Sequence, residues 1–121
     1  MSRGFIFGCL FALISICFGA IITHALSKQL SDADIRQLKT AGMYLYYMGI
    51  PLVMLSLSHK RYQWPGRIYN LFILSGVLFS GSLILYVFTD LHWMVYLTPL
   101  GGGCMMISWV YFLLLGIKKV G

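Results

Sequence analysis

The sequence contains few charged residues for its length. Only 10% of its 121 residues are charged, whereas 60% are hydrophobic. Water-soluble domains carry roughly 25% charged residues, and a domain of this size buries only about two-thirds of its chain. Such a domain could not hide this much apolar surface from water. The composition therefore excludes a small water-soluble fold and predicts a protein whose solvent is lipid.

Cysteine is scarce as well, and ionisable residues are missing where a membrane pathway would need them. The chain has three cysteines, no Cys-x-x-Cys pair and no cysteine outside an apolar stretch: Cys9, Cys17 and Cys104. They are expected to be small packing residues rather than disulfide or zinc ligands. No Asp, Glu, Lys, Arg or His lies near the middle of an apolar stretch, where ion and proton pathways usually place one.

Four apolar stretches are present, each long enough to cross a hydrocarbon core about 30 Å thick. They cover about residues 5–26, 40–58, 68–89 and 94–117. The first is longer than the 7–15 apolar residues of a signal-peptide core, so we expect it to remain as a helix. The sequence predicts an all-α fold, a four-transmembrane-helix antiparallel bundle with short loops, forming a single domain over residues 1–121.

The two longer loops carry local signals. Ser31 precedes Asp34 by three residues, a weak form of the capping box, which predicts a short helix or an early turn of the second span. In the second loop, Pro65-Gly66 predicts the chain reversal, and Tyr62 and Trp64 are expected in the lipid headgroup layer.

Basic residues are unequally divided between the two predicted faces of the membrane. With four spans, one face holds both termini and the second loop, with six basic residues: Arg3, Lys60, Arg61, Arg67, Lys118 and Lys119. The other face holds three basic residues and every acidic one: Lys28, Arg36, Lys39, Asp32, Asp34 and Asp90. This bias predicts that both termini are cytoplasmic. The net charge of +6 is explained by anionic lipid beside these residues, without a nucleic-acid partner.

Small residues recur where helices would touch. In lipid, helices associate by close backbone approach at such residues and by interhelical hydrogen bonds. The Gly-rich run 101–103 has no lysine nearby that would suit a phosphate loop, so we expect it to contact Ser80-Gly81-Ser82 of the preceding helix. The predicted packing residues are Gly8, Gly19, Ser80, Gly81, Ser82, Thr98, Pro99, Gly101, Gly102 and Gly103.

Three segments together carry a family resemblance: Phe18-Gly-Ala-Ile-Ile-Thr-His-Ala-Leu26, Phe79-Ser-Gly-Ser-Leu83 and Thr98-Pro-Leu-Gly-Gly102. They resemble domain-of-unknown-function family 423, the YgdD-like bacterial inner-membrane proteins, which are similar to the animal transmembrane protein 256. The second helix departs from the family pattern, because Leu45 and Met48 replace a Gln and a His. The resemblance implies four helices in a bacterial inner (plasma) membrane and brings no established activity.

Candidate sites for chemistry are few. His24, Asp90 and His92 are predicted near the same membrane face, where imidazole and carboxylate would suit a metal ion such as zinc. The same two histidines leave haem ligation open. The aromatic second helix leaves open a quinone or lipid cleft. No serine or cysteine has a visible activating base, so no catalytic residue and no cofactor are predicted.

The sequence favours a small non-enzymatic membrane protein that acts by helix packing. It would be an accessory or assembly subunit of a larger complex, or a self-associating protein, with the lipid bilayer and a membrane-protein partner or a second copy as partners. The alternatives are a small transporter or channel subunit, or a protein that binds quinone, lipid or metal. A transporter would need a polar path, for which the candidates are Thr23, Ser75, Ser80, Ser82 and Thr98.

Overall fold

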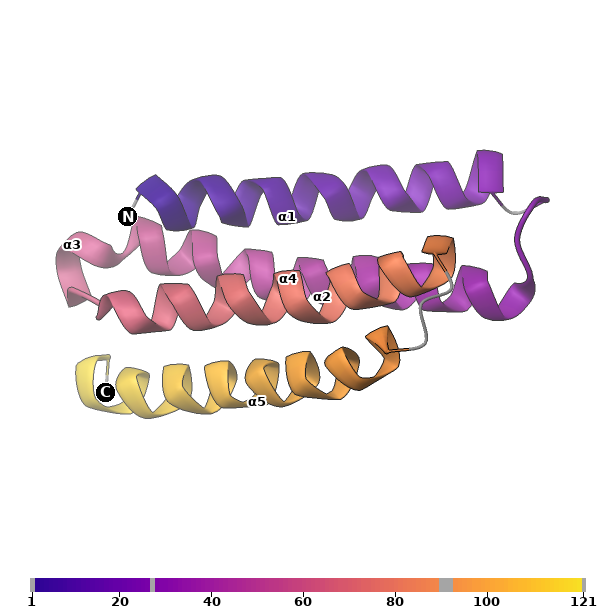
Figure 1. Ribbon diagram of the computed structural model, residues 1–121. Coiled ribbons are helices and arrows are strands. Elements are labelled where there is room, and N and C mark those ends of the chain that lie inside the picture. Colours follow the sequence, from indigo (N-terminus) through magenta and orange to yellow (C-terminus); the bar gives the residue numbers. More distant parts are fainter. Residues whose placement is uncertain (1, 27, 90–92, 121) are drawn as a thin grey trace.

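The computed structural model describes residues 2–26, 28–89 and 93–120, and every regular element in these ranges is helical (Figure 1). The elements are α1 (Ser2–Ile21), which continues into a π-helical turn (Ile22–Leu26), α2 (Asp32–Leu57), α3 (His59–Tyr62), α4 (Gly66–Thr89) and α5 (Met94–Lys119). Four of the helices, α1, α2, α4 and α5, are long and apolar enough to cross a membrane. The predicted fold class, an all-α bundle of four antiparallel spans, is confirmed.

The start of α2 follows from its cap. The Ser31 hydroxyl accepts a hydrogen bond from the backbone N–H of Asp34 at 3.2 Å. Asp32 and Asp34 lie in the first turn, where negative charge is favourable next to the positive end of the helix dipole. The polar residues after Ser31 are therefore the first turns of the second span, which confirms one of the two predicted alternatives.

The turn between α2 and α4 differs from the prediction at Trp64. Gln63 ends α3 with a φ of 51°, in the left-handed region, so the chain already reverses before Pro65-Gly66. Trp64 is only 4% exposed, and its indole N–H donates to Ser58 Oγ at 2.8 Å. Trp64 is therefore not an exposed side chain facing lipid headgroups, because its polar N–H finds a partner inside the protein, and its depth in the membrane stays a prediction from the sequence.

The four long helices pack in the order α1, α2, α4, α5 rather than around a common axis. The extensive interfaces are α1 with α2, α2 with α4, and α4 with α5. Figure 1 shows α1 and α5 on opposite edges with α2 and α4 between them, and both termini at the same end as α3. Both edge helices thus have one main neighbour, and most of their remaining surface is exposed.

The core lies between the two central helices. Met48, Leu52 and Leu55 of α2 and Ile68 and Phe72 of α4 are at most 1% exposed. Because their large side chains fill the α2–α4 contact, these two helices form the rigid centre on which α1 and α5 pack.

Candidate functional site between α2 and α5

The predicted metal site has one residue in the described part of the chain. His24 lies in the π-helical turn after α1 and is exposed, while Asp90 and His92 lie outside the described residues. Within residues 2–26, 28–89 and 93–120, no group of three His, Cys, Asp or Glu side chains is placed to hold a metal ion. The metal site therefore stays a prediction from the sequence.

Two of the predicted packing glycines, Gly8 and Gly101, lie in tight helix contacts, and a third, Gly102, lies in an ordinary one. A Cβ atom on Gly8 would lie 2.7 Å from Val53 Cγ2 and 2.8 Å from the carbonyl oxygen of Gly49, both on α2. A Cβ on Gly101 would lie 2.6 Å from the backbone nitrogen of Phe79 on α4. A Cβ on Gly102 would meet the Phe79 ring at 3.7 Å, an ordinary contact. Gly101 is therefore the glycine at which α4 and α5 approach most closely.

Three other predicted packing glycines are not in contact with a neighbouring helix. Added Cβ atoms at Gly19, Gly81 and Gly103 would meet no atom within 4 Å in the described part of the chain. These three glycines therefore do not form the contacts within the chain that the sequence suggested. At these three positions no neighbouring helix comes close enough for the absence of a side chain to matter.

The serines beside Gly81 do not share one partner helix. Ser80 Oγ donates to the carbonyl oxygen of Ala41 on α2 at 2.8 Å. Ser82 Oγ shares a hydrogen bond with Thr98 Oγ1 of α5 at 2.7 Å. The prediction that Ser80-Gly81-Ser82 faces α5 as a unit is correct only for Ser82, because residues two apart on a helix point in different directions. Pro99 is exposed and points away from this contact.

The hydroxyl groups proposed for a transport path are used inside the protein. Besides the Ser80 bond, the Ser75 hydroxyl lies 3.3 Å from Met48 Sδ and 3.2 Å from the carbonyl oxygen of Phe72. Thr23 Oγ1 donates to the carbonyl oxygen of Gly19 at 2.8 Å. The bonds of Ser75 to Met48, Ser80 to Ala41 and Ser82 to Thr98 join neighbouring helices, whereas the exposed Thr23 bonds within its own helical segment.

A concave surface lies between α2 and α5. At the end of the molecule that carries both termini, a hollow of about 830 Å³ opens between the two helices, which we name the basic-end hollow. Its lining is almost wholly apolar and includes Met54, Leu57, Trp64, Trp109, Phe112 and Ile117. Ligand sites typically measure about 300–1,000 Å³ and are lined in this way, so the hollow has the size of a binding site.

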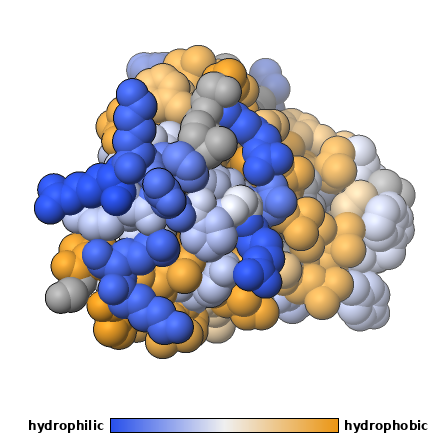
Figure 2. Space-filling view, turned by 90° about the vertical axis from the view of Figure 1, so that its left-hand side faces the viewer, coloured by the Kyte–Doolittle hydropathy of each residue, from blue (hydrophilic) through white to orange (hydrophobic). Residues whose placement is uncertain are grey.

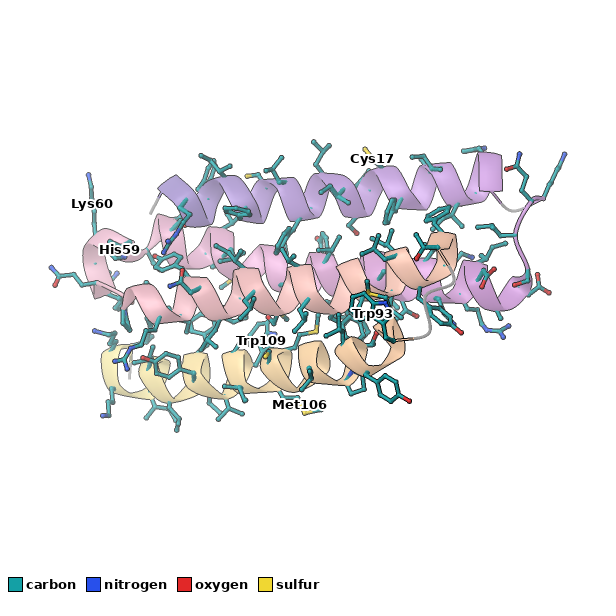
Figure 3. All side chains as sticks on the ribbon, viewed as in Figure 1. Cys17, His59, Lys60, Trp93, Met106 and Trp109 are labelled. Atoms are coloured by element: carbon teal, nitrogen blue, oxygen red, sulfur yellow. The ribbon has the colours of Figure 1, made fainter. Side chains whose placement is uncertain are left out.

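A second hollow of about 510 Å³ continues the first toward the middle of the membrane. The two share Trp109, which Figure 3 shows on the side of α5 that faces the other helices. The central hollow is lined by Tyr44, Tyr47, Met48, Phe79, Met105 and Met106. We call the two hollows together the α2/α5 groove; it extends from Tyr44 to Leu57 of α2 and along α5 from Gly102 onward, and it opens sideways toward lipid.

Aromatic contacts hold the wall of the groove in place. The Trp64 ring packs edge-on against Phe112 with 5.4 Å between ring centres, and Phe72 packs in the same way against Trp109 at 5.6 Å. Such pairs add roughly 0.5–1.5 kcal/mol beyond the apolar area that they bury. Trp64 is fixed further by its bond to Ser58, so the inner wall of the hollow at Trp64 and Phe112 belongs to the folded core, whereas Met54, Leu57, Trp109 and Ile117 form its exposed rim.

Positive charge gathers at the end where the basic-end hollow opens. The exposed side chains there are Arg3, Lys60, Arg61, Arg67, Lys118 and Lys119. Figure 2 shows hydrophilic side chains clustered on this face of the molecule, against apolar surface behind. The acidic residues in the described part of the chain, Asp32 and Asp34, begin α2 at the opposite end. Among the described residues, the mouth of the groove therefore carries positive charge with no acidic side chain beside it.

The cysteines lie away from the groove. Cys9 and Cys17 are exposed on α1, and Figure 3 shows Cys17 pointing away from the other helices. Cys104 of α5 is half-buried. All three are free thiols.

The comparisons with known proteins fit this architecture. The profile of a family described as "Protein of unknown function (DUF423)" matches residues 18–102, which is more than half of the chain. The chain belongs to the DUF423 family. The resemblance read from the three sequence segments is therefore confirmed.

DUF423 relatives match along nearly the whole chain. UPF0382 membrane protein SAB0533 of Staphylococcus aureus is 28% identical over 126 residues, covering 100% of both chains. YwdK of Bacillus subtilis is 28% identical, covering 93% of this chain and 94% of its own. The inner membrane protein YgdD of Escherichia coli is 26% identical, covering 93% and 88%. No solved structure matches the chain. This DUF423 member is a multi-pass protein of the bacterial inner membrane.

Sequence reasoning found one wall of the groove and missed the other. The aromatic and Met-rich α2 was identified as a candidate cleft wall, and Tyr44, Tyr47 and Met54 do line the groove. The lining from α5 was missed. Its signal was the spacing of Trp109, Phe112 and Gly116, which places them on one helix face.

Proposed function

We propose that this protein is a non-enzymatic membrane protein that binds a lipid through the α2/α5 groove. The groove itself carries the proposal, because it is a preformed, apolar concave surface that opens to the bilayer. Its wall is built from rings and thioethers, which adapt to flexible hydrocarbon chains. A non-enzymatic role is supported by the membrane hydroxyls, since Ser75, Ser80 and Ser82 are engaged in structural hydrogen bonds.

The orientation is part of the proposal. Six basic residues lie at the end that carries the termini, against three at the opposite end of the molecule, and positive charge is retained on the cytoplasmic side. Both termini and the mouth of the basic-end hollow would then face the cytoplasm. Fusion of a reporter that is active only in the cytoplasm to the C-terminus tests this arrangement; activity only from a periplasmic or extracellular reporter would contradict it.

Filling the basic-end hollow tests lipid binding directly. Gly116 lines this hollow, and a Cβ atom there would meet no atom within 4 Å. Gly116→Leu is therefore expected to occupy the hollow without disturbing the fold. Gly103→Leu is the matched control, because Gly103 is also in open space but lies outside the lining of the basic-end hollow.

The measurement is the amount of phospholipid that the purified protein retains in mild detergent, determined by native mass spectrometry. We expect bound lipid on the parent protein and on Gly103→Leu, and a loss of most of it on Gly116→Leu. Equal retention by the two variants, or no retained lipid on the parent protein, would overturn the proposal.

A second candidate function is supported by the glycines that have no neighbour. Gly19, Gly81 and Gly103 offer bare backbone to any helix that approaches from outside, as small residues do at membrane helix contacts. This fits an accessory subunit or a self-associating protein. Disulfide crosslinking between introduced cysteines at position 103 in native membranes tests self-association; the absence of a crosslinked dimer, with a monomeric mass in lipid nanodiscs, would count against it.

A further inference from the structure

We propose that the α2/α5 groove selects a phospholipid with an anionic headgroup, whose phosphate is held by Arg61, Lys118 and Lys119 while an acyl chain lies in the basic-end hollow. This inference rests on the proposed function and adds the chemical class of the ligand. It is carried by the juxtaposition of a positively charged mouth with an apolar hollow of about 830 Å³.

On the α3 side, a series of side-chain contacts connects the charge of Arg61 with the lining of the basic-end hollow. The guanidinium carbon of Arg61 lies 5.3 Å from the centre of the Tyr62 ring. Tyr62 lines the hollow and contacts Trp64 with its ring tilted by 48° and 5.4 Å between ring centres, and Trp64 contacts Phe112 on the far wall. The cation–π contact keeps the guanidinium at the mouth, where its planar set of donors can bind two phosphate oxygens at once.

On the α5 side, the last turn of the helix contains both residues that line the hollow and charged residues. Ile117 and Val120 line the hollow, and the exposed Lys118 and Lys119 lie between them in the sequence. Their backbone therefore lies at the level at which the hollow ends, and their long exposed side chains start from there. A phospholipid whose chain fills the hollow would place its phosphate at this level, between Arg61 and the two lysines.

The charge pattern favours an anionic headgroup over a neutral one. Asp32 and Asp34 lie at the other end of α2, which has 26 residues and is therefore about 39 Å long. At ordinary ionic strength the field of a charge is screened within about 8–10 Å. These carboxylates therefore do not neutralise the mouth. A zwitterionic headgroup would bring its own cation against three basic side chains, whereas an anionic glycerol-type headgroup would not.

The hollow also argues for a lipid rather than a soluble anion. A free phosphate would contact the basic side chains and leave the apolar lining empty. A phospholipid satisfies both surfaces, and the sideways opening of the groove gives its chain a route from the bilayer. We therefore expect the basic mouth and the apolar hollow to act on one molecule.

The experiment compares phosphatidylglycerol with phosphatidylcholine on the purified full chain in nanodiscs that contain equal amounts of both. Retained lipid is identified by native mass spectrometry. The mouth variant is Arg61→Gln/Lys118→Gln/Lys119→Gln. Its matched control removes three basic residues from the opposite face: Lys28→Gln/Arg36→Gln/Lys39→Gln. Because both leaflets of a nanodisc are identical, a change of membrane orientation cannot imitate the result.

We expect the parent protein and the control to prefer phosphatidylglycerol by about tenfold or more, and the mouth variant to lose most of this preference, because each basic side chain near the surface attracts anionic lipid. An unchanged preference in the mouth variant would overturn the inference. So would displacement of bound lipid by an equal concentration of glycerol 3-phosphate, because the site would then be a phosphate site alone.

The Gly116→Leu variant separates this inference from the proposed function. If it loses both lipids while the mouth variant keeps its full preference for phosphatidylglycerol, the groove binds lipid and the headgroup assignment is wrong. If the parent protein retains neither lipid, both proposals fail.

Discussion

Replacing Gly101 with alanine is expected to destabilise the contact between α4 and α5. The added Cβ would lie 2.6 Å from the backbone nitrogen and 2.7 Å from the Cα of Phe79. Carbon atoms in contact normally stay about 3.5–4.0 Å apart, so the helices would have to separate locally by about 1 Å. Because the colliding atoms belong to the backbone, no side-chain rotation can relieve the clash.

The separation has a second consequence one helical turn away. Ser82 Oγ and Thr98 Oγ1 share a 2.7 Å hydrogen bond between the same two helices, and about 1 Å of separation would stretch it beyond hydrogen-bond range. Overpacking typically costs about 1–3 kcal/mol, and an interhelical hydrogen bond in a membrane contributes about 0.6 kcal/mol. Alanine regains at most about 1 kcal/mol of helix propensity. The net loss of unfolding free energy for Gly101→Ala should therefore be about 2 kcal/mol.

The matched control is Gly103→Ala, two residues further along α5, where a Cβ would meet no atom within 4 Å. Its unfolding free energy should stay within about 0.5 kcal/mol of the parent value, as for other surface substitutions. Reversible unfolding by sodium dodecyl sulfate in mixed micelles, followed by tryptophan fluorescence, measures both. If the two variants are equally stable, the reasoning from close backbone approach is refuted.

Three further contacts are tested by substitutions in the same unfolding assay. Gly8→Ala should destabilise by about 1–3 kcal/mol, because its Cβ would clash with α2, whereas Gly19→Ala should be nearly neutral; the reverse order would contradict the α1–α2 contact. Ser80→Ala removes the 2.8 Å bond to the carbonyl oxygen of Ala41 and should cost about 0.6 kcal/mol, so a stabilised variant would argue against that bond. Trp64→Phe keeps most of the ring but loses the indole hydrogen bond and should cost about 0.5–1.5 kcal/mol, whereas a headgroup-layer tryptophan would tolerate the change.

Much of the fold could be predicted because lipid imposes strong constraints on sequence. A span must satisfy its backbone hydrogen bonds internally, so a long apolar run has few alternatives to a helix. The cap at Ser31 was also local, since it depends on a residue three positions away. The family resemblance could be recognised because the segments around Gly19, Gly81 and Gly101 follow one another in the same order as the family's motifs.

The candidate site could be predicted only in part. The apolar, aromatic side of α2 was recognised, but the groove needs a second wall. The spacing of Trp109, Phe112 and Gly116 places them on one face of α5, yet the sequence does not show that this face lies beside α2. The contacts of Ser80 and Ser82 show the same limit. Both are small polar residues in one short segment, yet one bonds to α2 and the other to α5.

The sequence by itself determined that the chain lies in a membrane, that it crosses it in four helices, and where its charges gather, because each of these depends on composition and on the length of single segments. Only the tertiary structure decided that α1 and α5 become the edges of the array, that Trp64 turns inward, and that an apolar groove opens beside the basic end. The physical reason is that helix neighbours in lipid are chosen by close backbone approach at individual glycines. Gly101 meets a backbone and Gly103 meets open space, although the two are indistinguishable in the sequence.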